Sequence, residues 1–160
     1  MKRVVVRLKR IGELRQKLPL PMPMTEGSAG LDLHAAVKDD LTLQPLERVL
    51  VSTGLAIQLP EGYAAEIRPR SGLAIRDGVT LLNTPGTVDQ DYRGEIKVIL
   101  INLGHVAARI RSGQRIAQLI VHKVHQVQWE EVDRLQPTGR GSKGFGSTGE
   151  GGNQDSSHED

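Results

Sequence analysis

The segment NTPGTVDQDYRGE, residues 83–95, gathers two carboxylates, an aromatic ring and an arginine in a turn-rich stretch of chain. Asp89 and Asp91 have the D-x-D-x-x-G spacing that opens a calcium-binding EF-hand loop. Arg93 at the fifth position and Leu100 at the twelfth exclude that chemistry. Two interpretations remain, because the carboxylates fit both a structural role in a turn and a role in a functional site. Their spacing alone does not choose between them.

A second group of residues, in IRPRSGLA at positions 67–74, offers ligands for an anion. Arg70 and Ser71 stand beside the flexible Gly72, where a strand-like segment ends. Ser71 lacks the G-x-S-x-G setting of an activated nucleophile, because Pro69 takes the place of the first glycine. The segment therefore predicts an anion site. The alternative is a solvated basic strand end, which is the commoner situation for a single arginine.

Two polar side chains interrupt apolar segments that predict strands. Asp32 stands between Leu31 and Leu33, and strand alternation places it on the face opposite the two leucines. Taken alone, Asp32 is expected to be an outward-facing acid. Gln118 interrupts RIAQLIV at residues 115–121. A glutamine buried in such a strand needs a hydrogen-bond partner, so a satisfied core residue and a ligand-binding residue are both open interpretations.

The chain changes character at Gly139. Residues 139–160 hold one large apolar side chain, Phe145, which is too little to form a core. The G-x-G-x-x-G spacings here fit neither a dinucleotide fold, which needs a following helix, nor a Walker A loop, which needs a lysine at position 145. Arg140, Lys143 and the glycine amides are suited to wrapping phosphate oxygens. A plain disordered terminus is the alternative.

The elements that must position these groups are short and apolar. Many Val-, Ile- and Leu-rich runs separated by turn signals predict an all-β sandwich or barrel. Alternation in EIKVIL predicts a strand over residues 95–100. Only LAIRD, after Ser71-Gly72, is expected to form a helical turn or two. Because the chain has only four aromatic residues, we expect a core of Val, Ile, Leu and Ala.

Composition excludes several classes of protein. The absence of cysteine rules out disulfides and thiolate metal sites. No apolar run approaches the roughly 18 residues of a membrane span, and MKRVVVRLKR lacks a signal-peptide apolar region, so a cytoplasmic protein without membrane contact is expected. The last eleven residues hold four acids, so the preceding 149 residues carry 21 bases against 15 acids, a balance of +6. This basic body favours an anionic ligand.

Five segments together resemble the sequence motifs of one family, the homotrimeric dUTP pyrophosphatases (dUTPases). In chain order they are AGLDLHA (29–35), PRSGLA (69–74), NTPGTVDQDYRGE (83–95), RIAQLIV (115–121) and RGSKGFGSTG (140–149). The resemblance runs from about residue 3 to residue 149, and its order and spacing make it highly specific. The acidic residues from Glu150 onward lie outside the pattern.

The resemblance implies an all-β jelly-roll or distorted β-barrel of mostly antiparallel strands, in a homotrimer whose active sites are shared between subunits. It divides the chain into a barrel domain (1–138), a mobile glycine-rich lid (139–149) and a disordered acidic tail (150–160). The implied reaction is Mg²⁺-dependent hydrolysis of dUTP to dUMP and pyrophosphate by attack of water on the α-phosphorus. That reaction limits uracil incorporation into DNA and supplies dUMP for dTMP synthesis.

The third motif then answers the question that spacing left open. By its place in the motif, Asp89 resembles the carboxylate that orients and deprotonates the attacking water. Asn83 would read the uracil edge, and Tyr92 would lie against the deoxyribose and exclude a 2′-hydroxyl. The resemblance assigns three further substrate-binding residues to this part of the chain: Thr87, Val88 and Lys97.

The other motifs supply the phosphate ligands. Arg70, Ser71 and Gly72 would bind phosphate oxygens, and Gln118 would bind the α-phosphate. Asp32 resembles the acid that holds the metal through its water shell, which suits the sparing use of protein ligands by Mg²⁺.

The glycine-rich motif would close over the bound nucleotide. By resemblance, Arg140 clamps the γ-phosphate and Phe145 stacks on uracil. Gly146, Ser147 and the neighbouring Thr148 would complete the contacts to the substrate.

Two rival functions come from different classes. The dCTP deaminases share the implied fold and triphosphate site, but they are expected to lack the complete DYRGE segment and the Arg–Phe glycine tail. A nucleic-acid binder would account for the basic body, although four aromatic residues make a poor stacking platform. We therefore expect dUTP, and not nucleic acid, to be the partner of this chain.

Overall fold

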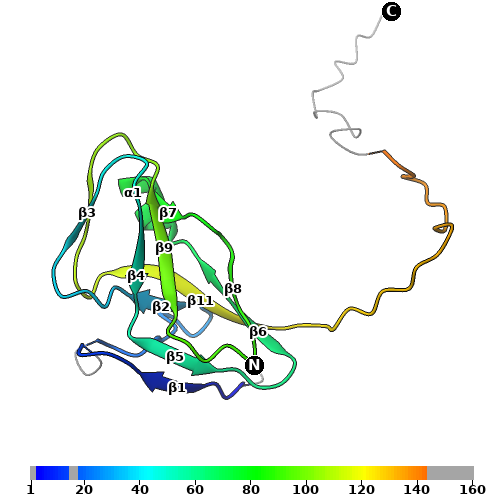
Figure 1. Ribbon diagram of the computed structural model, residues 1–160, viewed down its shortest axis with the longest axis horizontal. Helices are drawn as coiled ribbons and strands as arrows, with labels where there is room; N and C mark the ends of the chain where they lie inside the picture. Colours follow the sequence, from blue (N-terminus) through cyan, green and yellow to red (C-terminus); the bar gives the residue numbers. More distant parts are fainter. Residues whose placement is uncertain (1–2, 15–17, 144–160) are drawn as a thin grey trace, which may run out of the picture. The chain divides into compact units, whose positions relative to one another are not determined.

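The computed structural model describes residues 3–14 and 18–143, and they form eleven strands and one helix (Figure 1). The chain divides into two compact units, Met1–Gln126 and Val127–Asp160, and all of the secondary-structure elements lie in the first. The elements are β1 (Arg7–Arg10), β2 (Leu31–His34), β3 (Leu41–Leu43), β4 (Arg48–Ser52), β5 (Leu55–Gln58), β6 (Tyr63–Arg68), α1 (Ser71–Asp77), β7 (Val79–Leu81), β8 (Gly86–Val88), β9 (Lys97–Asn102), β10 (Ala108–Ile110) and β11 (Arg115–Lys123).

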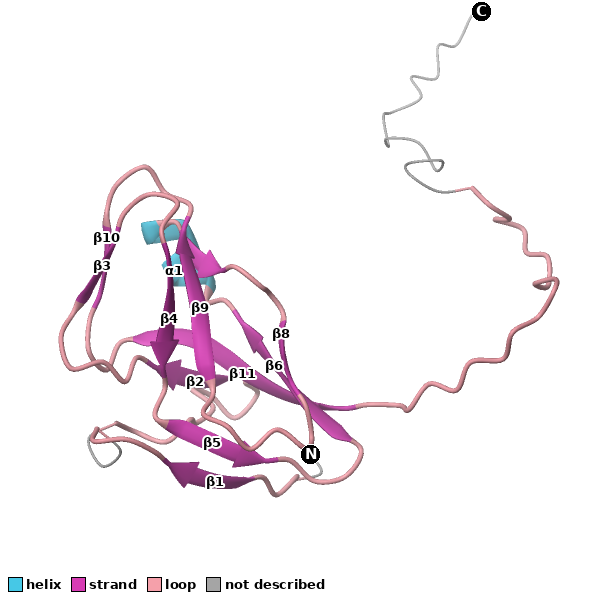
Figure 2. Ribbon diagram, in the orientation of Figure 1, coloured by secondary structure: helices cyan, strands magenta, loops and turns pink. Residues whose placement is uncertain are grey.

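The strands form four small sheets, and every pairing between them is antiparallel (Figure 2). The largest sheet has the order β2-β11-β6-β8, and a three-stranded sheet has the order β4-β9-β7. Two-stranded sheets, β1-β5 and β10-β3, complete the unit. The predicted all-β, mostly antiparallel architecture is confirmed, and the single helix lies where LAIRD predicted a helical turn.

The core contains only aliphatic side chains. All buried hydrophobic residues of the described chain are Val, Ile, Leu or Ala, as the shortage of aromatic residues predicted. In β9, Val98 and Leu100 are buried while Lys97 is exposed and Ile99 half-buried, so the alternation predicted for this strand is confirmed. The strand begins at Lys97, two residues later than EIKVIL indicated, because Glu95 and Ile96 bond to the β4–β5 junction instead.

The described part of the second unit, residues 127–143, exposes its large apolar side chains. Trp129 is 90% exposed and Leu135 is 81% exposed. The first compact unit ends at Gln126, whereas the sequence analysis placed the end of the barrel at residue 138. Because the apolar side chains of this segment are exposed, residues 127–138 add little to a core. The described helix is too short to cross a membrane.

Candidate active site

The predicted nucleoside residues gather around residues 82–96, the segment that carries β8 and is here called the hairpin. Within it β8 pairs with β6, while the preceding strand β7 pairs with β9. A cavity of about 260 Å³ there is lined by Asn83, Thr87, Val88, Tyr92 and Lys97, together with apolar side chains from β4, β6 and β7. We call this cavity the hairpin pocket. It brings together five residues that the sequence assigned to one ligand. The sixth, Asp89, directly follows the pocket-lining end of β8.

Glycine allows two side chains of the hairpin pocket to fold close to the backbone. A Cβ atom at Gly86 would lie 3.2 Å from the Nδ2 atom of Asn83. A Cβ atom at Gly94 would lie 2.6 Å from the Cζ atom of Tyr92, and the Tyr92 hydroxyl donates a 3.0 Å hydrogen bond to the Glu95 carbonyl. The tyrosine ring is therefore held against the glycine that follows it, with 45% of the residue exposed.

The base of the hairpin is tied to the β4–β5 junction. The Ile96 amide donates to the Leu55 carbonyl at 2.7 Å, and the Thr53 hydroxyl donates to the Ile96 carbonyl at 2.6 Å. The Gly54 amide donates to the Glu95 carboxylate at 2.9 Å. Since Thr53 is buried, this junction gives the hairpin a rigid support. Sequence reasoning missed Glu95 as a supporting residue.

The predicted phosphate ligands gather at a second cavity, of about 370 Å³, which we call the phosphate pocket. It is lined by Asp32, Arg70, Ser71, Gly72 and Gln118 and by the loop before β2. Strand register explains this gathering, because Gln118 in β11 lies opposite Asp32 in β2. The helix α1 begins at Ser71, shortly after the end of β6, and adds Ser71 and Gly72, while Arg70 stands at its N-cap.

Asp32 does not face outward, as the residue taken alone was expected to do. It is only 6% exposed, and its two carboxylate oxygens accept hydrogen bonds from Arg70 Nε at 2.9 Å and Arg115 Nη1 at 3.1 Å. A buried carboxylate requires this kind of pairing. Asp32 thus orients Arg70 at the edge of the phosphate pocket. Sequence reasoning missed Arg115, whose place beside Asp32 depends on a register shift in β11.

Gln118 is half-buried and forms part of the pocket wall. Its Nε2 atom donates a 3.3 Å hydrogen bond to the Pro69 carbonyl. A Cβ atom at Gly30 would overlap the Oε1 atom of Gln118, so a larger residue at this position would displace the amide from its present place. The two interpretations of Gln118 therefore combine: the amide is satisfied by the backbone and also lines a polar cavity. Gly30 is a second residue that sequence reasoning missed.

Backbone amides at the start of α1 add donors to the phosphate pocket. The Leu73 and Ala74 amides both bond to the Arg70 carbonyl, at 3.1 and 3.0 Å. Within the described chain, the Ser71 and Gly72 amides have no backbone partner, and no side chain caps the helix. The first amides of a helix are free in this way, which suits them to bind phosphate oxygens.

His34 borders the Asp32 cluster on the same strand. Burial lowers the pKa of the His34 imidazole, and the nearby Arg115 and Arg70 act in the same direction against the opposing effect of Asp32. The neutral form of His34 is therefore favoured beside two cations.

The described residues contain no group of three or more His, Asp or Glu side chains that could hold a metal ion. A Mg²⁺ ion held mainly by phosphate oxygens and water fits this site. Each carboxylate oxygen of Asp32 accepts one hydrogen bond and retains a lone pair for a metal-bound water.

The tail residues assigned by sequence are described only in part. Arg140 is exposed, and its Nε atom donates a 2.9 Å hydrogen bond to the Lys143 carbonyl. Phe145, Gly146, Ser147 and Thr148 lie outside the described residues.

Comparison with known proteins identifies one family. The model of the dUTPase family matches residues 16–149. A protein of Fusobacterium nucleatum named deoxyuridine 5′-triphosphate nucleotidohydrolase is 51% identical over 149 residues, covering 93% of this chain and 99% of that protein.

Solved structures show the same fold. The dUTPase of Staphylococcus bacteriophage 80alpha with dUpNHpp superposes with a TM-score of 0.81 at 23% identity, covering 91% of this chain and 98% of that one. A mutant dUTPase of phage phi11 of S. aureus, described as coordinating a structural Mg(II) ion, has a TM-score of 0.73 at 18% identity. It covers 83% of this chain and 99% of that one.

Proposed function

Because the chain belongs to the dUTPase family, we propose that it hydrolyses dUTP to dUMP and pyrophosphate by attack of water on the α-phosphorus. One observation carries the proposal: the protein presents one pocket at the hairpin and a separate pocket lined by candidate phosphate ligands, and both contain residues expected for this reaction. In a cell, this activity would act on the cytoplasmic nucleotide pool, limit uracil incorporation into DNA and supply dUMP for dTMP synthesis.

The hairpin pocket is the proposed nucleoside site. Asn83 and the backbone of Thr87 and Val88 hydrogen-bond the uracil edge, and the ring of Tyr92 lies against the deoxyribose. Because Tyr92 is held on Gly94, a 2′-hydroxyl meets a ring that has no room to retreat. Lys97 at the rim of the pocket adds a positive charge toward the substrate.

The phosphate pocket is the proposed triphosphate site. Arg70 is aimed by Asp32 and retains N–H donors that no described residue uses. These donors, the Ser71 and Gly72 amides and the Gln118 side chain stabilise the charge that develops on the phosphate oxygens. By resemblance to the family, Arg140 would bind the γ-phosphate, and Phe145, Gly146 and Ser147, which lie outside the described residues, would contact the nucleoside.

Asp89 is the proposed general base. Its carboxylate has no hydrogen bond or ion pair with any described residue, so it is available to a water molecule at the end of the hairpin pocket. Mg²⁺, when bound to the triphosphate, would supply charge neutralisation at the phosphate oxygens. Asp32 would hold the water shell of that ion, and its hydrogen bond keeps Arg70 in place.

A homotrimer explains why the two pockets are separate. The hairpin pocket and the phosphate pocket share no lining residue, which is compatible with a site that combines the hairpin of one subunit with the phosphate pocket of another. The outer face of the sheet β4-β9-β7 also exposes an apolar row. Leu50 is 57% exposed and lies opposite Ile99, whose carbonyl accepts the amide of the 50%-exposed Leu82. Burying this row between subunits would be favourable.

Pyrophosphate release from four nucleotides tests the proposal. We expect dUTP to be hydrolysed, with kcat/KM at least about tenfold higher than for dTTP, because one methyl group in a tight pocket is worth about 1–3 kcal/mol. UTP and dCTP should also be poor substrates. Comparable rates for dUTP and dTTP would contradict the nucleoside site. Release of ammonia from dCTP would instead identify a deaminase of the same fold.

A further inference from the structure

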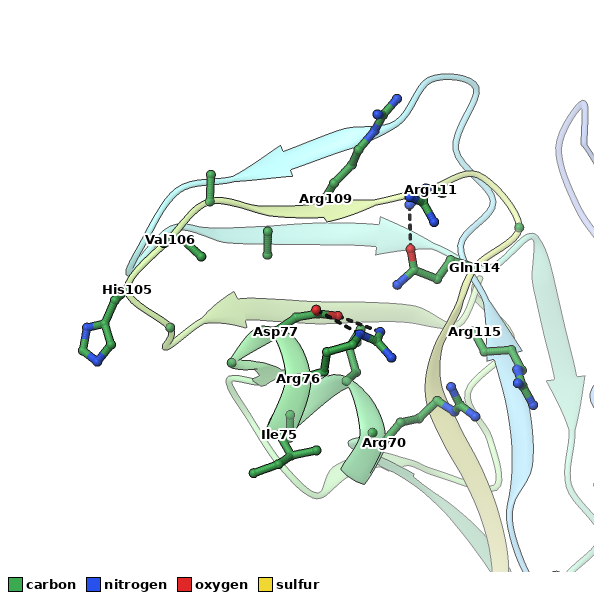
Figure 3. Close-up of a pocket in the computed structure, with 18 of the residues that line it drawn as sticks. Arg70, Ile75, Arg76, Asp77, His105, Val106, Arg109, Arg111, Gln114 and Arg115 are labelled. Carbon is green, nitrogen blue, oxygen red and sulfur yellow. Dashed lines mark hydrogen bonds and ion pairs between the residues drawn. The ribbon is translucent and has the colours of Figure 1, made fainter.

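The largest cavity of the described chain is lined by arginines, most of which the proposed reaction does not use. It has a volume of about 1170 Å³ and lies between α1, the loop after β9 and the turn between β10 and β11 (Figure 3). We call it the arginine groove, after the five arginines that line it: Arg70, Arg76, Arg109, Arg111 and Arg115. Asp77 is the only acid and His105 the only other basic side chain among the lining residues.

Carboxylates hold four of these arginines in place. Asp77 accepts two hydrogen bonds from Arg76, at 3.1 and 2.7 Å. Asp40 pairs with Arg109 at 2.8 Å, and the buried Asp32 pairs with the remaining two, as described above. Each guanidinium has five N–H donors, so each arginine keeps donors that its carboxylate does not use. Even with all three carboxylates counted, five arginines leave two positive charges in excess.

The fifth arginine, Arg111, stands on a turn that is fixed at several points. The Ser112 amide donates to Asp40 at 3.0 Å and the Ser112 hydroxyl donates to the Val37 carbonyl, while the Gly113 amide donates to the Ala35 carbonyl at 2.8 Å. Figure 3 shows the further bond from the Arg111 amide to the Gln114 side chain, at 2.8 Å. The Arg111 guanidinium itself has no partner in the described chain. The fold thus presents an unpaired cation from a rigid turn.

The lining of the groove identifies the chemical class of its ligand. The groove contains arginine without lysine, and the planar guanidinium fork matches the oxygens of phosphate groups in a bidentate manner. No Phe, Tyr or Trp side chain lines it, so it lacks the large aromatic rings on which proteins usually stack a nucleobase. We propose that the arginine groove binds short chains of phosphate groups, such as inorganic pyrophosphate and tripolyphosphate, at a site separate from the nucleotide.

The groove adjoins the proposed active site. Arg70 and Gly72 line both the groove and the phosphate pocket, so the two cavities are adjacent. A role in the exit of pyrophosphate rests on the proposed function, whereas binding of the anion does not depend on it.

Calorimetric titration of the full chain with inorganic pyrophosphate, in magnesium-free buffer, tests the proposal. We expect saturable binding that persists when dUpNHpp saturates the nucleotide site. Arg111→Gln should raise the Kd for pyrophosphate about 5–10-fold, since a charge-assisted hydrogen bond at an exposed site contributes modestly. Arg7→Gln, on the exposed strand β1, is the matched control and should bind like the parent chain. Arg111 is not a residue of the proposed active site. A separate assay of dUTP hydrolysis therefore tests the proposed function independently of pyrophosphate binding.

Three results would overturn the proposal. The first is no binding of pyrophosphate to the assembled protein, as when the groove is covered by another subunit. The second is complete displacement of pyrophosphate by dUpNHpp, which would place the anion in the nucleotide site. The third is an unchanged Kd in Arg111→Gln. Failure of dUTP hydrolysis alone would contradict the proposed function and leave the binding result intact.

Discussion

At the scale of single residues, Asp89 and Asp91 have the same side chain and different positions. Asp89 directly follows β8, at the end of the hairpin pocket. Asp91 lies inside the turn that the Tyr92 amide closes on the Asp89 carbonyl at 3.2 Å. We expect Asp89→Asn to lower kcat about 10²–10⁴-fold, because the amide keeps the shape of the acid and loses its basicity. Asp91→Asn, the matched control, should lower kcat much less.

Steady-state kinetics together with the Kd of dUpNHpp separate binding from catalysis in these variants. Nucleotide affinity should be nearly unchanged in Asp89→Asn. A larger loss of kcat in Asp91→Asn than in Asp89→Asn would show that the base has been assigned to the wrong acid.

Gly94 sets the position of the Tyr92 ring, and this gives a prediction about sugar selectivity. Because a Cβ atom at residue 94 would overlap the ring, Gly94→Ala must displace it and open space for a 2′-hydroxyl. We expect the ratio of kcat/KM for dUTP over UTP to fall at least about tenfold, a change of about 1.4 kcal/mol. Tyr92→Phe keeps the ring and removes only the bond to Glu95, so it should retain most of the selectivity. Equal selectivity in Gly94→Ala and the parent chain would contradict this role.

Some site residues could not be found from sequence. The motif positions of Asp89, Tyr92 and Gln118 were informative because chemistry fixes the residue type there. Arg115 and Gly30 act through other residues: one pairs with Asp32 and the other leaves room for an amide. Such roles depend on strand register and close packing, which become visible only when distant segments are placed together.

At the scale of elements, β2 and β11 are joined by the Asp32 cluster as well as by backbone pairing. Asp32→Asn should lower the free energy of unfolding by about 1–3 kcal/mol, because it removes a buried carboxylate that pairs with two arginines. The loss is limited because both arginines are partly exposed, so water can solvate them when the carboxylate is gone. Glu66→Gln, which breaks the exposed pair with Arg68, should cost less than about 1 kcal/mol. Urea denaturation measures both. Equal effects would show that the buried cluster adds no special stability.

His34 makes the stability of this sheet depend on pH. Burial lowers its pKa in the folded protein, while the unfolded chain keeps a value near 6.5. Between these two values the unfolded chain binds more protons, so the free energy of unfolding should decrease as the pH falls below about 6.5. The contribution is fully present above that pH. Urea denaturation at pH 7.5 and 5.5 should show a smaller decrease in His34→Gln than in the parent chain. An identical decrease would exclude His34 as a cause.

The positions of the strands could be predicted where apolar and polar residues alternate clearly, as in β9. They were harder to predict where one apolar run forms two successive strands. The run RVLVSTGLAIQL forms β4 and β5, which are separated at Gly54 by a positive φ of 70°. The seven-residue helix α1 was predicted as a helical turn, because Gly72 lies near its start and Gly78 directly follows its end. The pairing of β11 between β2 and β6 was not predictable, since it joins segments about 50 to 90 residues apart in sequence.

At the scale of the whole molecule, the proposed sharing of a site between subunits predicts that an active unit contains more than one chain. A symmetric trimer would place the hairpin pocket of each subunit against the phosphate pocket of a neighbour. Burial of the apolar row on the sheet β4-β9-β7 would hold the subunits together. A lone chain of 17.5 kDa would have neither a complete site nor a covered row.

Activity of mixed assemblies tests this account most directly. Asp89→Asn disables the hairpin half of a site, and Arg70→Ala disables the phosphate half, so each variant alone should hydrolyse dUTP at only a small fraction of the parent rate. When the two variants are co-assembled in equal amounts, about a quarter of the sites should combine two intact halves from different subunits and recover activity. If the mixture shows only the average of the two variants, each site lies within a single chain and the shared-site account is wrong.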